Sequence, residues 1–208
     1  MLFDFDGTVV DTVELIRESH RHATRQVLGV ELSDRELVAR VGLPLSDQMR
    51  AFSEEHADEL LRVYREWNHG HTAELIREYP GMSDLLAELR AAGRPLGLVT
   101  SKMRPVADLA FAVLPLRDYF DVIVTTEDTV RHKPAPDPVL HALRALDARP
   151  EDAVMVGDAP FDLRAGAAAG CITVGVTWGF FDRETLSALG PDAVVDDTAE
   201  LADLLLRR

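Results

Sequence analysis

Cysteine is scarce in this sequence, and long apolar runs are missing from it. Cys171 is the one cysteine among 208 residues, which excludes an internal disulfide and favours a buried thiol. No apolar run approaches the roughly 18 residues of a membrane-spanning helix. The first residues also lack the basic segment and the apolar run that form a secretory signal. We therefore expect a cytoplasmic protein that does not enter a membrane.

Positive charge is also in short supply. The net charge is −14 at pH 7, which argues against a nucleic-acid partner. Among the 22 basic residues only Lys102 and Lys133 are lysines, so arginine carries the routine surface charge. An ammonium group is a compact point charge, unlike the planar fork of arginine. The two lysines are therefore candidates for positions that need a point charge.

The pattern of apolar residues changes near residue 80. From residue 13 to 79 the apolar positions follow helical spacing, Ser33 and Glu36 form a capping box, and no strand-like run appears. Beyond residue 80, short apolar strands alternate with helices, which is the pattern of a parallel sheet covered on both faces. The expected strands are 1–5, 95–100, 121–125, 153–156, 171–176 and 193–195.

The helical segment separates the first expected strand from the others. We therefore predict an α/β fold: a doubly wound, Rossmann-like parallel sheet core formed by residues 1–12 and 80–208, with an inserted α-helical cap at 13–79. A chain of this length can hold one substantial core and a smaller insert. Ligands bind such a sheet beyond the carboxyl ends of its strands, so the residues that follow each strand are the candidates for chemistry.

Two aspartates follow the first strand, in the segment Asp4-Phe5-Asp6-Gly7-Thr8. A strand period of two would point both carboxylates to the same side, and Gly7 lets the chain turn sharply. Like charges at this spacing need a metal ion, a shared proton or a cation beside them. A surface turn is the alternative interpretation, since aspartate and glycine are common in turns.

Three further strand ends carry polar residues. Thr100 and Ser101 offer hydroxyls and backbone N–H groups that could cradle an anion or simply cap the next helix. Lys133 lies in a loop stiffened by prolines, which suits a positioned cation or, alternatively, an exposed turn. Asp158 and Asp162 lie on a strand-to-helix turn, where they could bind Mg²⁺ or cap the helix.

The combined charge of these strand ends favours the functional interpretation. Four carboxylates would meet at one edge of the sheet, and a bound phosphate dianion would add about two more negative charges. Such a cluster stays ionised only in the presence of cations, for which Mg²⁺ and Lys133 are the natural candidates. A metal ion would also stabilise transferring phosphoryl oxygens, and aspartate is a competent nucleophile for forming an aspartyl-phosphate.

These motifs resemble those of the haloacid dehalogenase superfamily, and of its phosphatases in particular. The segment from Asp4 to Thr8, Thr100, Lys133 and the segment 157–162 match the four family motifs in order, and the resemblance spans essentially the whole chain. The helical insert is similar to the small cap of the phosphoglycolate phosphatase and β-phosphoglucomutase branch. One departure is that only three residues precede Asp4, where related chains have a longer first strand. This departure bears on the stability of the strand and on whether the natural chain begins earlier.

The resemblance implies a role for each motif residue. Asp4 would be the nucleophile, and Asp6 would protonate the leaving oxygen and later activate water. Thr100 and the Ser101 backbone would hold phosphoryl oxygens, while Lys133 would neutralise developing charge and restrain Asp4.

The same resemblance implies Mg²⁺ as the cofactor. Its ligands would be Asp4, the backbone carbonyl of Asp6, and Asp158. Asp162 would be either a further ligand or a residue of the outer shell.

The insert would select the substrate. Arg65 and His69 lie one helical turn apart and could bind a second anionic group of a small phosphorylated substrate, or else face solvent. Residues 64–71 and 98–102 are similar to the bacterial pyrophosphatase branch of the family, whereas the general resemblance is to phosphoglycolate phosphatases. The expected activity is that of a phosphatase acting on a phosphoglycolate-like metabolite. An inorganic pyrophosphatase, a phosphosugar mutase and a non-catalytic binding module are the alternatives.

Overall fold

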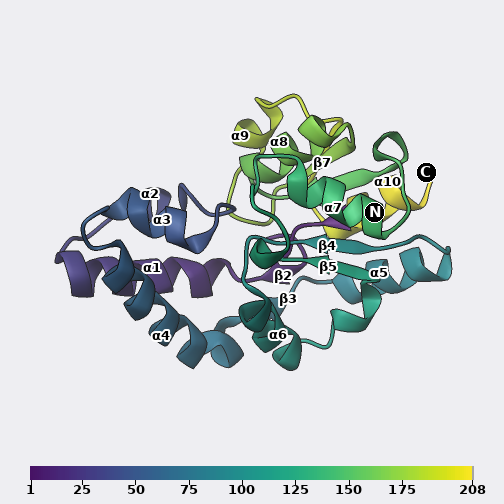
Figure 1. The fold of residues 1–208 in the computed structure, drawn as a ribbon. Coiled ribbons are helices and arrows are strands. Elements are labelled where there is room, and N and C mark those ends of the chain that lie inside the picture. The colour runs from purple at the N-terminus through teal and green to yellow at the C-terminus, as the bar shows by residue number, and fades with distance from the viewer. Residues whose placement is uncertain (208) are drawn as a thin grey trace.

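The computed structural model describes residues 1–207, and a parallel six-stranded sheet lies at its centre (Figure 1). The strands follow the order β5-β4-β1-β6-β7-β8. Their bounds are Leu2–Phe3 (β1), Gly97–Val99 (β4), Val122–Val124 (β5), Val154–Gly157 (β6), Ile172–Val176 (β7) and Ala193–Val195 (β8). Strand β1 pairs with β4 on one side and with β6 on the other. The carboxyl ends that lead to Asp4, Thr100 and Asp158 are therefore neighbours.

Helices cover both faces of this sheet (Figure 1). Leu2 and Phe3 belong to different cores, because successive side chains of a strand point to opposite faces. Phe3 packs in a core with helices α5, α6 and α10, and Leu2 packs in a second core with α7 and α8. The bounds of the helices around the sheet are Met82–Ala91 (α5), Arg104–Val113 (α6), Asp137–Ala145 (α7), Pro160–Ala169 (α8), Arg183–Ser187 (α9) and Thr198–Leu206 (α10). This arrangement confirms the predicted α/β, Rossmann-like fold and explains why the central strands are apolar on both faces.

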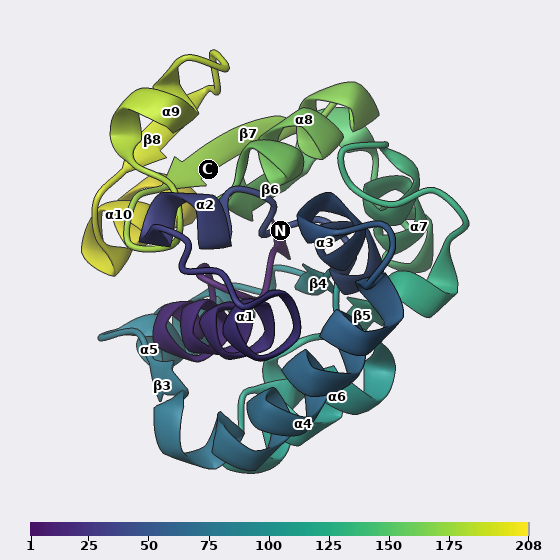
Figure 2. The same cartoon turned by 90° about the vertical axis from the view of Figure 1, so that its left-hand side faces the viewer.

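A separate group of helices lies beside the sheet (Figures 1 and 2). Its members are Val13–Leu28 (α1), Asp34–Val38 (α2), Leu45–Phe52 (α3) and Ala57–Leu75 (α4). The predicted capping box of Ser33 and Glu36 begins α2, and Gly29 ends α1 in the left-handed conformation. The group has its own small core, formed by Ala23, Met49, Leu60, Val63 and Tyr64. Within residues 1–207, no helix is both long and apolar enough to cross a bilayer.

A short antiparallel pair of strands joins the helical group to the sheet. Strand β2 (Val10–Asp11) precedes α1, and β3 (Arg77–Glu78) follows α4; the two strands pair with each other. The sequence pattern indicates no strand in this region, and the structure corrects that expectation. Two-residue strands are too short to show a period of two, so their pairing is set by the tertiary structure and not by a local signal.

Candidate active site

Asp4 lies directly after the central strand and is almost completely buried. Its backbone N–H donates to the Val156 carbonyl at 2.9 Å, which continues the ladder between β1 and β6. Gly7 then adopts a φ of 73°, and a Cβ atom at this position would collide with the carboxylate of Asp158. Glycine is therefore required here both for the turn and for the close approach of the backbone to Asp158. The side chain of Asp4 is only 5% exposed.

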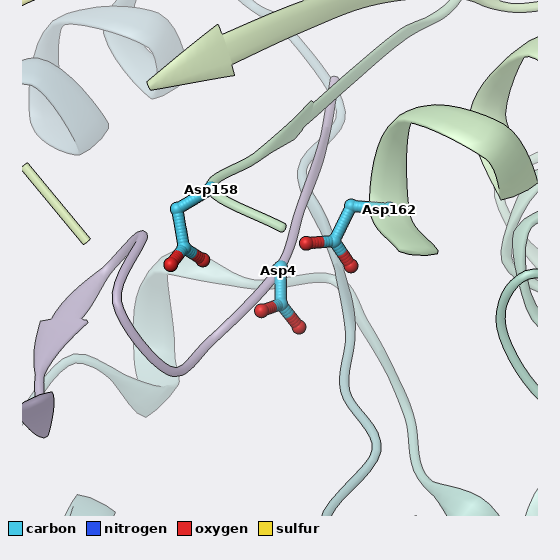
Figure 3. A group of neighbouring side chains, drawn as sticks. All are labelled: Asp4, Asp158 and Asp162. Carbon is cyan, nitrogen blue, oxygen red and sulfur yellow. The ribbon is translucent and has the colours of Figure 1, made fainter. Parts of the chain in front are cut away.

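Asp158 and Asp162 come from the carboxyl end of β6 and the first turn of α8. Figure 3 shows their carboxylates pointing toward that of Asp4, and one oxygen of each residue lies within 4.8 Å of the other two. Asp162 can approach β6 because Gly157 has no side chain; a Cβ atom there would overlap the Asp162 side chain. The backbone N–H of Ala159 donates to Asp162 Oδ2 at 3.1 Å and fixes its orientation.

Lys133 connects two of these three carboxylates. Its ammonium group donates to Asp4 Oδ1 at 2.6 Å, to Asp162 Oδ1 at 2.5 Å and to the Val99 carbonyl at 3.1 Å. An ammonium group has three donors, so all three are used. The Lys133 side chain is 1% exposed, which excludes the exposed turn left open by the sequence.

Burial and crowding change the proton affinity of these groups. Burial, and next the charge of Asp162, raise the pKa of Asp4 to about 7. Burial and the charges of Asp162 and Asp4 raise the pKa of Asp158 well above its ordinary value. Burial acts to lower the pKa of Lys133, but the two neighbouring carboxylates outweigh it and keep the ammonium group charged. One ammonium group thus faces three buried carboxylates, and the site has an excess of negative charge.

The excess charge and the donor set fit a magnesium ion. Carboxylate oxygens are the hard ligands that Mg²⁺ prefers. Among the described residues 1–207, Asp158 accepts hydrogen bonds from neutral groups alone, the Thr8 hydroxyl at 3.0 Å and the Phe180 backbone N–H at 2.7 Å. Among residues 1–207, no ammonium or guanidinium group pairs with Asp158, so its charge is the one that most needs a further cation. The group of Asp4, Asp158 and Asp162 is therefore suited to hold a divalent metal ion.

The loop after β7 contributes to the site, although no motif in the sequence points to it. Gly179 lies so close to Asp158 that a Cβ atom would collide with the carboxylate, and the N–H of Phe180 bonds to the same group. Trp178 donates its indole N–H to the Thr8 carbonyl at 3.1 Å. The only local signal was a Trp-Gly-Phe segment after a strand end, a pattern that has no specific meaning without knowledge of the fold.

The carboxyl end of β4 brings three consecutive residues to the site. Thr100 is buried, and its Oγ1 accepts from the backbone N–H of Lys102 at 3.2 Å. The Ser101 hydroxyl donates to the Gly42 carbonyl at 2.6 Å, which ties this strand end to the helical group. Lys102 Nζ lies 2.9 Å from Asp6 Oδ1, the oxygen that also accepts from the Thr12 hydroxyl at 2.8 Å. Both lysines of the chain therefore contact aspartates of the Asp4–Thr8 segment.

A cavity of about 250 Å³ lies between the sheet and the helical group. Asp4, Asp6 and Asp158 line it from the sheet side, and Arg65 and His69 line it from α4. The predicted pair on α4 thus faces the same cavity as the aspartates, and Arg65 Nη2 donates to the sulfur of Met103 at 3.2 Å. Apolar side chains form much of the remaining wall, namely Ile16, Val41, Leu43, Pro44, Leu45 and Val106.

Not every predicted site residue reaches the cavity. Thr100, Lys133 and Asp162 are absent from its lining, whereas Ser101 and Lys102 are present. Thr100 and Lys133 are almost fully buried, as Asp4 and Asp158 are, but they do not form part of the cavity wall. The structure thus brings the motif residues together, some of them on the cavity wall and the others behind it.

Comparison with known proteins places these features in context. The family profile described as haloacid dehalogenase-like hydrolase matches residues 1–176. Pyrophosphatase PpaX of Anoxybacillus flavithermus is 35% identical over 205 residues, which cover 99% of this chain and 95% of that protein. Pyrophosphatase PpaX of Bacillus thuringiensis is 36% identical with the same coverage.

Solved structures show the same fold along the whole chain. A predicted phosphatase from Clostridium acetobutylicum superposes with a TM-score of 0.88 at 28% identity and covers 100% of this chain and 97% of its own. A predicted phosphoglycolate phosphatase from Haemophilus somnus has a TM-score of 0.89 at 22% identity, with 98% and 96% of the two chains covered.

Proposed function

The chain belongs to the haloacid dehalogenase-like hydrolase family and to its phosphatases, and we propose that it hydrolyses a small phosphorylated metabolite with Mg²⁺ through an aspartyl-phosphate at Asp4. The observation that carries this proposal is the position of Asp4. It is buried at the end of the central strand, held by Lys133, and it still lines the cavity. A carboxylate so placed is shielded from bulk water but can reach a ligand.

Asp4 Oδ2 is the proposed attacking atom. Lys133 binds Oδ1, and among residues 1–207 no hydrogen-bond donor is bound to Oδ2. Attack forms a bond between Asp4 Oδ2 and phosphorus and breaks the bond from phosphorus to the leaving oxygen. Lys133 then neutralises charge on the phosphorylated side chain and keeps it in place.

Asp6 is the proposed general acid and base. It lines the cavity two residues beyond Asp4. In the first step it gives a proton to the leaving oxygen, and in the second step it takes a proton from the water that attacks phosphorus. The second step releases inorganic phosphate and restores the carboxylate of Asp4, so that all atoms and protons balance over the cycle.

The backbone N–H of Ser101, on the cavity wall, and the Thr100 hydroxyl just behind it would hold the phosphoryl oxygens, next to Lys133. Asp4, Asp158 and the backbone carbonyl of Asp6 would hold Mg²⁺, with Asp162 in contact with it or one shell further out. When bound, the metal ion supplies positive charge that offsets the carboxylates and the phosphoryl oxygens. Hydrogen bonds from Thr8 and Phe180 orient Asp158 for this purpose.

The helical group is the proposed substrate-selecting cap, with boundaries at residues 13–79. Arg65 and His69 would contact a second anionic group of the substrate, because both line the cavity opposite the aspartates. The proposed substrate is small and anionic, and the proposed location is the cytoplasm. A nucleic-acid partner is not proposed, because the net charge is −14.

Inorganic pyrophosphate is a second candidate substrate beside phosphoglycolate-like compounds. It is supported by two relatives named pyrophosphatase that are 35% and 36% identical over almost the whole chain. A non-catalytic binding role is disfavoured, because the acids and the lysine that the reaction requires are all present and assembled. A mutase remains an alternative that product analysis would distinguish from a phosphatase.

A phosphate-release panel tests the proposal. Purified protein would be assayed with 2-phosphoglycolate, pyrophosphate, a sugar phosphate and a nucleotide, each with and without Mg²⁺. We expect Mg²⁺-dependent release of phosphate, with the highest kcat/KM for 2-phosphoglycolate or pyrophosphate, the two small candidates that carry a second anionic group. Isomerised sugar phosphate without release of phosphate would indicate the mutase instead, and no turnover of any compound would overturn the proposed activity.

A further inference from the structure

Lys102 lies at the cavity but has no role in the proposed mechanism. Its ammonium group lies 2.9 Å from Asp6 Oδ1, and its side chain is 13% exposed and lines the cavity. The backbone is firmly fixed, because its N–H donates to Thr100 Oγ1 and its carbonyl accepts from the N–H of Thr126 at 3.0 Å. The ammonium group is therefore presented at a defined place and is not a mobile surface charge.

The two lysines differ in how many donors remain for a ligand. Lys133 uses all three N–H donors on Asp4, Asp162 and the Val99 carbonyl. Within residues 1–207, Lys102 Nζ has one polar partner, Asp6, which leaves two donors beside the cavity. Lys133 can stabilise the carboxylates but has no donor left for a ligand. Lys102 can bind a ligand anion and still keep its ion pair with Asp6.

Lys102 also lies on the leaving-group side of the reacting phosphorus. Asp6 is the group proposed to protonate the leaving oxygen, so a cation in contact with Asp6 is on the leaving-group side. Arg65 also lines the cavity, from α4, and its guanidinium group lies 3.2 Å from the sulfur of Met103, the residue after Lys102. A leaving group that carries a negative charge could thus meet both the ammonium group of Lys102 and the guanidinium group of Arg65 at the cavity wall.

We propose that Lys102 is a substrate-binding residue that holds an anionic oxygen of the leaving group, next to the oxygen that Asp6 protonates. The substrate class that follows is a phosphoryl compound with an anionic oxygen a few bonds beyond the scissile bond, such as a second phosphate or a carboxylate. A phosphate ester with an uncharged leaving group has no partner for the two remaining donors. This inference rests on the proposed function, since it uses the role of Asp6.

The test compares substrates whose leaving groups differ in charge. Lys102→Met keeps the length of the side chain and removes the ammonium group. Kinetics would be measured with pyrophosphate and 2-phosphoglycolate as charged cases and with ethyl phosphate, whose leaving oxygen also needs a proton from Asp6, as the reference without a second anion. Arg62→Met is the matched control, because Arg62 is exposed on α4, outside the cavity lining, and its loss changes the net charge equally.

We expect Lys102→Met to lower kcat/KM for the charged substrate by roughly 10- to 100-fold more than for the reference ester, chiefly through KM. Activity on the ester also falls, since Asp6 loses its partner, but the ratio of the two kcat/KM values changes. Arg62→Met should leave that ratio within about threefold of wild type. An equal loss on both kinds of substrate would mean that Lys102 only orients Asp6, and it would overturn the inference.

A binding measurement separates this inference from the proposed function. Methylenediphosphonate, which resembles pyrophosphate but resists hydrolysis, would be titrated into wild type and Lys102→Met by calorimetry, with inorganic phosphate as the reference. We expect the Kd of the diphosphonate to rise roughly tenfold or more and the Kd of phosphate to change much less. Wild type that releases no phosphate would refute the proposed function. Active wild type with an unchanged diphosphonate Kd in the variant would refute only the role of Lys102.

Discussion

A single ammonium group, that of Lys133, is buried together with two carboxylates. Burying a charge is costly unless it is paired and hydrogen-bonded, and Lys133 has a partner for each of its donors. Asp158 lies beside this group without a cationic partner among residues 1–207. At the scale of the residue, the charge of Lys133 is fully paired, whereas the charge of Asp158 has no cation beside it. This imbalance of charge is expected of a site that binds a metal ion.

Replacement of Lys133 by methionine should destabilise the metal-free protein by about 3–5 kcal/mol near pH 8, because it leaves buried carboxylates unpaired. The loss should be smaller at pH 5. The folded pKa of Asp4, about 7, lies above the ordinary value, so the folded state binds more protons than the unfolded state between about pH 4 and 7. Stability from this group is therefore lost as the pH rises, and removal of Lys133 steepens that loss.

Urea unfolding of wild type and Lys133→Met at the two pH values would measure this effect. Lys133→Arg serves as a second variant, because it keeps the charge but cannot fit the compact three-donor site. Equal destabilisation of Lys133→Met at pH 5 and pH 8 would show that the carboxylates do not depend on the ammonium group.

At the scale of the element, the strand ends were the predictable part of the site. The sequence pointed to four residues that lie just beyond short apolar strands, namely Asp4, Asp6, Thr100 and Asp158, because parallel strands bring their carboxyl ends together. Lys133 lies well beyond β5 and was selected as one of two lysines, in a loop stiffened by prolines. The resemblance to the haloacid dehalogenase superfamily, read from the same residues, is confirmed by the family profile. Their catalytic roles and the boundaries of the cap stay predictions.

Contacts between elements could not be read from the sequence. The hydrogen bond from Ser101 to Gly42, the approach of Gly179 to Asp158 and the pairing of β2 with β3 all join segments far apart in the chain. None has a local signal, because the residues involved are small or form strands too short for a period. The position of Thr100 and Lys133 behind the cavity wall likewise depends on packing that only the fold defines.

The loop between α2 and α3 is the element whose position can be tested directly. Gly42 has a φ of 104°, and a Cβ atom there would lie 2.8 Å from the Phe161 ring. Gly42→Ala should therefore displace the loop. Ser101→Ala should displace it less, by removing the hydrogen bond to the Gly42 carbonyl. Both variants should lower kcat/KM, by roughly tenfold for Gly42→Ala, since the backbone strain and the clash cost about 1–3 kcal/mol.

Limited trypsin digestion would report the loop position without an activity assay. Arg40 lies two residues before Gly42, so cleavage after Arg40 should be faster in both variants than in wild type. Ser187→Ala, an exposed change on α9 far along the chain, is the control for Ser101→Ala. Unchanged cleavage after Arg40 in Gly42→Ala would show that the contact with Phe161 does not hold the loop.

At the scale of the whole molecule, a bound metal ion should be visible as added stability. A ligand that binds only the folded state stabilises it by about 2.7 kcal/mol at a concentration of 100 times its Kd. Mg²⁺ should therefore raise the melting temperature of wild type. Asp158→Asn should weaken this effect strongly, because Asp158 is the carboxylate without a cationic partner.

Thermal unfolding with increasing Mg²⁺, after treatment with a chelator, would measure this dependence. Asp192→Asn is not a suitable control, because Asp192 bonds to Thr173 and has a structural role. Asp203→Asn is better matched, since Asp203 is exposed on α10 and pairs only with Arg207 among residues 1–207. An equal rise of the melting temperature in wild type and in Asp158→Asn would place the metal ion elsewhere.

Asp4 is the residue proposed to attack phosphorus and to carry the phosphoryl group. The most direct measurement is mass spectrometry of the protein after rapid acid quench with p-nitrophenyl phosphate and Mg²⁺. Asp6→Asn is the variant of choice, because this leaving group needs no proton, whereas hydrolysis of the intermediate still needs the base. We predict a phosphoryl adduct on Asp4 in Asp6→Asn, no adduct in the double variant with Asp4→Asn, and a loss of turnover on the order of 10⁴-fold or more in Asp4→Asn alone. Near-wild-type release of phosphate by Asp4→Asn, or an adduct on another residue, would contradict the account.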